Sequence, residues 1–159
     1  MVLKPLKHER PNPNRIVRFM DELKFRGFNQ STYYPLRMMP SGVFINAKAD
    51  QKSDEARVQL GLWLASWFGR VSEFPYLGER NDVLPPPVIP ILIVESMSWQ
   101  LWFAFDTPSQ YEVCGPVKIG DTYELESAYR LLAVLRISAH WMATGFLEWV
   151  DDCLKQAVV

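Results

Sequence analysis

The stretch that decides the fold runs from Gly42 to Trp67 and reads GVFINAKADQKSDEARVQLGLWLASW. Its first part suits an extended conformation, in which successive side chains point to opposite faces. Val43 and Ile45 then fall on one face, whereas Phe44 and Asn46 fall on the other. This part therefore predicts a strand that carries Asn46 on the same face as an aromatic residue.

The second part of this stretch predicts a helix that begins near Ser53. Its apolar stripe recurs at intervals of three and four residues and consists of Leu60, Trp63, Leu64 and Trp67. Glu55 and Gln59 lie one turn apart on another side of the same helix. The side that carries these two polar residues is the informative one for function.

The remaining elements are predicted in the same way, from the alternation typical of strands and the spacing of three and four residues typical of helices. Residues 14–27 predict a short helix, and the segment from Thr122 predicts a long amphipathic helix that can bend at Gly145. The apolar stripe of this long helix consists of Leu125, Ala128, Leu132, Leu135, Ala139, Met142 and Phe146. Three apolar strands begin at the end of the proline-rich linker at residues 79–90 and read VIPILIVES, SWQLWFAFD and YEVCGPVKIGD.

The order of these elements is helix, strand, helix, three strands and a long helix. The three consecutive strands can pair antiparallel, so the order predicts an α/β or α+β protein with a small mixed sheet. A chain of 159 residues, 48% of them hydrophobic, has the size of one domain with a sizeable core. We therefore expect a basic N-terminal arm at residues 1–14 and a single domain at residues 15–155.

Cysteine usage and hydropathy indicate the compartment. Cys114 and Cys153 lie far apart, without the paired spacing of a zinc site or a disulfide framework, which favours a reducing compartment. The N-terminus lacks the apolar core of a signal peptide, and no apolar run approaches the roughly 18 residues that a membrane helix needs. We expect a soluble protein of the cytoplasm or nucleus, without a membrane partner.

The charges are divided unevenly along the chain. Residues 1–48 contain nine Lys and Arg against three Asp and Glu, whereas residues 49–159 contain eight against fifteen. A basic segment can neutralise the phosphates of a nucleic acid. It can equally fold against the protein's own acidic surface, so the charge pattern leaves a nucleic-acid partner open.

Segments along most of the chain resemble a known family. Residues 42–67, together with NQSTYYPLRMMP before them and with VIPILIVESMSWQLWFAF and KIGDTYELESAYRLLAVLR after them, are similar to the fungal branch of the PD-(D/E)XK nuclease-like proteins. The resemblance extends roughly from Arg15 to Cys153. It implies a restriction-endonuclease-like core, α/β (α+β) in class, with a small mixed β-sheet flanked by helices and a long C-terminal helix.

The resemblance assigns roles to three residues of the decisive stretch. In this family two carboxylates hold Mg²⁺, one of them two residues before a lysine that helps to orient the attacking water. Lys48 matches that lysine, and Gln59 matches a glutamine that lines the same pocket. Asn46 occupies the carboxylate position, and a neutral amide lacks a charge that is worth several kcal/mol beside a divalent ion. Metal affinity is therefore expected to fall by orders of magnitude.

The second carboxylate of the family motif is also absent from its expected position. The family places it on a strand before the first helix, where this sequence has only MVLKPLKHE, with Leu3 near the expected place. The chain therefore resembles a shortened member with a degenerate motif. A carboxylate that has moved can restore the site, and Glu55, one turn before Gln59, and Asp50 are the candidates. Mg²⁺ is expected as a cofactor only in that case.

Residues outside the motif are candidates for binding a ligand. An aromatic pocket could include Tyr33, Tyr34 and Trp63, and Glu95 ends an apolar strand where it could face the pocket. His140 has no second ligand at metal spacing, which favours a core or interface histidine.

Three classes of function follow from the altered motif. The first, which we favour, is a non-nucleolytic protein that binds a partner or ligand through the remnant pocket of Asn46, Lys48 and Gln59. The second is an active Mg²⁺-dependent nuclease with Glu55 as the migrated carboxylate. The third is a small-molecule enzyme of the secondary-metabolite type with an aromatic pocket. The expected partner is an unknown small molecule or protein, a nucleic acid remains possible through the basic N-terminal part, and a homo-oligomer is compatible with all three classes.

Overall fold

The computed structural model describes residues 13–22, 27–31, 33–37, 39–48, 53–72 and 87–156. For residues 13, 22, 35, 48, 53–56 and 156 it describes the backbone alone. Leu3, Asp50 and most of the predicted N-terminal arm therefore lie outside the described residues. In the parts of the chain that are described, none of the helices is long and apolar enough to cross a bilayer.

Four strands form one mixed sheet in the order β1-β2-β3-β4. They are β1 (Phe44–Lys48), β2 (Ile89–Glu95), β3 (Ser98–Asp106) and β4 (Tyr111–Asp121). β1 pairs with β2 in parallel, which requires a crossover connection, and α3 (Ser53–Ser72) lies in that connection. β2, β3 and β4 pair antiparallel in sequence order, which confirms the predicted strands and the predicted mixed sheet.

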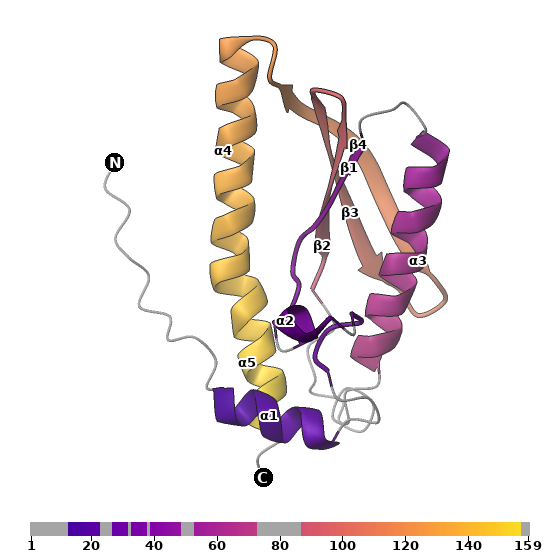
Figure 1. The fold of residues 1–159 in the computed structure, drawn as a ribbon, viewed down its shortest axis with the longest axis vertical. Helices are drawn as coiled ribbons and strands as arrows, with labels where there is room; N and C mark the ends of the chain where they lie inside the picture. Colours follow the sequence, from indigo (N-terminus) through magenta and orange to yellow (C-terminus); the bar gives the residue numbers. More distant parts are fainter. Residues whose placement is uncertain are drawn as a thin grey trace, which may run out of the picture.

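Helices cover both faces of this sheet (Figure 1). α3 lies on one face, and α4 (Leu125–Trp141) lies on the other. Side chains alternate between the two faces along β2. Ile91 and Ile93 therefore pack in the main core cluster together with residues of α3. Leu92 points to the other face and packs in a smaller cluster with Leu131 of α4. The sheet is thus the middle of three layers.

α3 buries most of its predicted stripe. Leu60, Leu64 and Trp67 are buried, and Phe68 beside them is buried as well. Trp63 departs from the prediction, because its side chain is 53% exposed. It contacts Phe44 of β1, which is a strand at the edge of the sheet, so solvent reaches the rest of the indole.

α4 confirms its predicted stripe only in part: Leu135 packs against the smaller cluster, but Leu131, which the stripe did not include, is the buried residue. Leu131 is 5% exposed, whereas Leu132 of the predicted stripe is 47% exposed and Leu125 is more exposed still. The sequence LLAVL at residues 131–135 is apolar on all sides, so its period could not select the buried residue. Contact with β4 selects it, because Leu131 lies against Gly120, where the missing side chain allows the helix to approach the strand.

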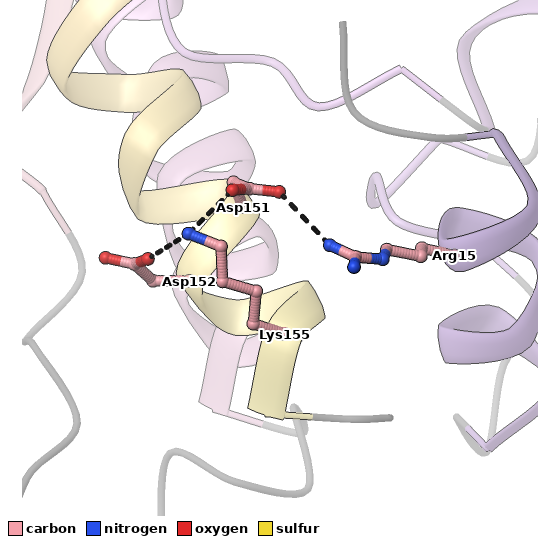
Figure 2. A network of polar contacts seen from close by, with 4 residues as sticks. All are labelled: Arg15, Asp151, Asp152 and Lys155. Carbon is pink, nitrogen blue, oxygen red and sulfur yellow. Dashed lines mark hydrogen bonds and ion pairs between the residues drawn. The ribbon is translucent and has the colours of Figure 1, made fainter. Parts of the chain in front are cut away.

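The C-terminal helix contains a wider turn. α4 continues into the π-helical turn η1 (Met142–Phe146), which includes Gly145, and then into α5 (Leu147–Gln156). α1 (Pro13–Glu22) crosses α5 at one end of the molecule (Figure 1). Figure 2 shows the ion pairs there: Arg15 lies 3.9 Å from Asp151, and the Lys155 ammonium lies 2.8 Å from the same carboxylate. Hydrogen bonds to Asp151 and Asp152 raise the pKa of Lys155.

The two cysteines differ in their environments. Both are free thiols, but Cys114 is exposed on β4 and Cys153 is buried in α5. Burial raises the pKa of the Cys153 thiol from 9.0 to about 12. Because unfolding returns this pKa to its ordinary value, the thiol favours the folded state below about pH 9, and the contribution is lost as the pH rises towards 12.

Candidate functional site

A pocket of about 290 Å³ lies between β1 and α3. Asn46 and Gln59, which the sequence assigns to one site, both line it, and so does Trp63. The other lining residues are Ser41, Val43, Phe44, Ile45 and Leu60. We call this cavity the Asn46 pocket.

Aromatic contacts fix one end of the Asn46 pocket. The Phe44 ring meets Trp63 edge to face at a centroid distance of 6.0 Å, and it meets Trp67 at 6.4 Å. Phe44 and Asn46 share a face of β1, because side chains alternate along a strand. Gln59 lies one turn before Trp63 in α3. The contact between Phe44 and Trp63 therefore brings Asn46 and Gln59 to the same level of the pocket.

The advance per residue along β1 and α3 predicts the next pair of residues that lie at the same level. Two residues of strand advance about 6.6 Å and four residues of helix advance about 6 Å. A helix that connects two parallel strands runs antiparallel to them, so the next step along both elements places Lys48 level with Glu55. The backbones of Lys48 and Glu55 are described but their side chains are not. Their place in the pocket stays a prediction.

A carboxylate lies beside Lys48 on the neighbouring strand. In the parallel register of β1 and β2, Glu95 is the partner of Lys48. Residues paired on adjacent strands lie about 5 Å apart and belong to the same face of the sheet, so Glu95 lies on the face that carries Asn46. Glu95 is half-buried and is not one of the residues that line the pocket.

Ser41 is a pocket residue that the sequence did not reveal. The buried side-chain amide of Asn29 donates a hydrogen bond of 2.6 Å to the Ser41 hydroxyl. Arg70 of α3 is also buried, and its Nε and Nη2 donate to the Gly27 carbonyl at 3.0 and 2.6 Å, which ties this segment to the helix. These residues lie in irregular backbone or make tertiary contacts, so no sequence period marks them.

The other predicted ligand-binding residues lie outside the pocket lining. Tyr33 and Tyr34 are exposed at the start of the short helix α2 (Tyr34–Arg37), where the Arg37 guanidinium lies 5.4 Å from the centroid of the Tyr34 ring. Neither tyrosine lines the Asn46 pocket, and a role for them in binding stays a prediction. His140 is exposed on α4, which excludes a place in the core.

Comparison with known protein families identifies the superfamily of the chain. The family model described as the PD-(D/E)XK nuclease superfamily matches residues 1–147 of the chain. The chain belongs to the PD-(D/E)XK nuclease superfamily. No curated protein and no solved structure matches it. With this membership, the mixed sheet between helices and the long C-terminal helix confirm the predicted restriction-endonuclease-like fold.

In this PD-(D/E)XK protein, the described polar groups of the pocket carry no charge. They are the side-chain amides of Asn46 and Gln59 and the hydroxyl of Ser41. Mg²⁺ binds oxygen ligands and usually takes one or two carboxylates from the protein, so this donor set does not fit Mg²⁺. Among the described residues, no group of three His, Cys, Asp or Glu is placed to hold a metal ion.

Proposed function

We propose that the chain is a non-nucleolytic member of the PD-(D/E)XK superfamily that binds a ligand or partner through the Asn46 pocket. The observation that carries this proposal is the pairing of Asn46 with Gln59 in one pocket whose described donors are all neutral. An amide has one acceptor oxygen and two N–H donors. Two amides and a hydroxyl therefore suit hydrogen bonding to a polar ligand rather than the binding of a metal ion.

The size and lining of the pocket favour a small ligand. About 290 Å³ is close to the lower end of the range in which small-molecule pockets occur, which is roughly 300–1,000 Å³. The exposed Trp63 and Ile45 supply apolar surface beside the amides. This mixture suits a compact ligand with an apolar part and several hydrogen-bonding groups.

Glu95 supports a role for Lys48 that needs no metal. A lysine whose neighbouring motif position is neutral needs another negative partner to stay charged if it is desolvated. The register places Glu95 beside it at the ends of the two parallel strands. In our proposal, Glu95 supplies the negative charge that the metal-binding carboxylates would otherwise supply, and Lys48 donates hydrogen bonds to the ligand.

Substitution of Lys48 and Gln59 tests this proposal. We expect Lys48→Ala and Gln59→Ala to abolish the function of the protein in the cell, measured by complementation of a strain that lacks the gene. The melting temperature should change by less than about 2 °C, because substitutions away from the core typically alter stability by at most about 0.5 kcal/mol. Gln59 is exposed, so its truncation leaves no buried cavity.

Matched controls are available on β4 and in the turn before it. Lys118→Ala and Gln110→Ala remove the same two side-chain types at exposed positions outside the pocket, and both variants should complement fully. Full complementation by Lys48→Ala and Gln59→Ala as well would show that the pocket is only a remnant.

A nuclease with a migrated carboxylate is the second candidate function. The argument that favours it is the match of strand and helix rises, which predicts that Glu55 lies level with Lys48. A carboxylate there would lie one helical turn from Gln59 and could replace the charge that Asn46 lacks. Cleavage of a nucleic acid in the presence of Mg²⁺ distinguishes this candidate from the first.

A further inference from the structure

A second cavity lies on the same side of the sheet as the Asn46 pocket, between α3 and strands β2 to β4. Its volume is about 190 Å³. Leu60 borders both cavities, and the second is otherwise lined by different residues. We call it the Arg57 slot; its lining residues are Arg57, Leu60, Gly61, Leu64, Ile93, Trp102 and Val113.

One face of α3, which includes a glycine, forms one wall of the Arg57 slot. Arg57, Gly61 and Leu64 recur at intervals of four and three residues, so they share one face of α3. A Cβ atom at Gly61 would meet nothing within 4 Å. A longer side chain there would enter the slot, so the space depends on this glycine.

One cation lies among apolar side chains in the Arg57 slot. The Arg57 guanidinium lies 5.7 Å from the centroid of the Trp102 ring, within the range of a cation–π contact. Arg57 is exposed, and none of the ion pairs found among the described residues involves it. Within the described part of the chain, its charge is therefore open to an anion that enters the slot.

Trp102, on the opposite wall, packs closely against the backbone of β4. The Gly115 backbone lies against its ring, since a Cβ there would come within 2.8 Å of two ring carbons. The indole N–H of Trp102 is buried and has no hydrogen-bond acceptor among the described residues. Protein atoms cover this N–H, so its NMR signal serves as a reporter of changes around the Trp102 ring rather than as a contact to the ligand.

We propose that the Arg57 slot binds a small aromatic carboxylate, at a site separate from the Asn46 pocket. A planar guanidinium matches the geometry of a carboxylate with two parallel hydrogen bonds. The apolar walls and the Trp102 ring suit an aromatic ring. A volume of about 190 Å³ lies below that of most drug-sized pockets, which limits the ligand to a single ring with a short acidic group.

The test is a titration of the full chain with benzoate, followed by the indole N–H signals in ¹⁵N-resolved NMR. The signal that disappears in Trp102→Phe is the one from Trp102, and we expect benzoate to shift it saturably. Arg57→Gln should weaken the affinity about tenfold, because a charged hydrogen bond is lost. Gly61→Leu should abolish the shift by filling the slot. Ala65→Leu, one turn further on the exposed side of α3, adds the same side chain outside the slot and should bind normally.

Two comparison ligands test the chemical class. Benzamide keeps the ring without the charge, and acetate keeps the charge without the ring, so both should bind much more weakly than benzoate. The proposal is overturned if the Trp102 signal does not move up to the solubility limit of benzoate. It is also overturned if Gly61→Leu binds as well as Ala65→Leu, or if benzamide binds as well as benzoate. Gln59→Ala should leave benzoate binding intact, so the result is independent of the function of the Asn46 pocket.

Discussion

Replacement of Phe146 with alanine is expected to lower the free energy of unfolding by about 3–5 kcal/mol, the usual range for loss of a buried phenylalanine. Phe146 is 1% exposed. Its ring lies 5.7 Å from that of Trp141 and 5.9 Å from that of Trp149, measured between centroids. It also lies against Gly42, where a Cβ would come within 2.6 Å of the ring. These neighbours are rings or backbone, so we expect them to move little into the cavity that the substitution leaves.

Urea unfolding of Phe146→Ala measures this loss, with Leu132→Ala as the control. Leu132 is on the same long helix but is largely exposed, so its truncation should cost less than about 1 kcal/mol. Equal losses in the two variants would contradict the assignment of the buried helix face. Because Gly42 separates Ser41 from Val43, both of which line the Asn46 pocket, Phe146→Ala should also weaken ligand binding there.

Replacement of Gly120 with alanine is expected to destabilise the fold by about 3 kcal/mol. Gly120 has a φ of +149°, a conformation that side-chain-bearing residues rarely adopt and that costs them about 1–3 kcal/mol. A Cβ there would come within 2.5 Å of the Ser127 carbonyl oxygen and 3.1 Å of the Leu131 Cβ. Both contacts belong to α4, so the alanine would push this helix away from β4.

Gly61→Ala is the matched control, and it should change stability in the opposite direction. Gly61 lies inside α3 with open space at its Cβ position, and alanine is preferred to glycine in a helix by about 1 kcal/mol. Thermal or urea unfolding of the two variants gives the comparison. A loss of stability in Gly61→Ala similar to that in Gly120→Ala would refute the steric explanation.

The sequence predicted the elements better than it predicted their faces. Strong apolar runs bounded by prolines and turns marked β2, β3 and β4, and the alternation at residues 43–46 marked β1. The buried face of α4 was predicted only in part, because residues 131–135 are apolar in every direction. Only the close approach at Gly120, a tertiary contact, distinguishes Leu131 from Leu132.

The pocket was predictable in part for a similar reason. Asn46 and Gln59 belong to regular elements, so their periods and the family resemblance placed them together before the structure did. Ser41 lies in irregular backbone positioned by the side chain of Asn29, twelve residues earlier in the chain. The Arg57 slot was also missed, because it needs residues from α3 and from three strands to meet.

The proposal that the Asn46 pocket works without metal-dependent cleavage is tested most directly by a nuclease assay. Purified protein is incubated with single- and double-stranded DNA and RNA in the presence of Mg²⁺ or Mn²⁺. We expect no more product than in samples with a chelator, because the described pocket residues include no carboxylate to hold the ion. Metal-dependent cleavage that disappears in folded Glu55→Ala, but persists in the surface variant Glu126→Ala, would contradict the proposal and establish Glu55 as a migrated metal ligand.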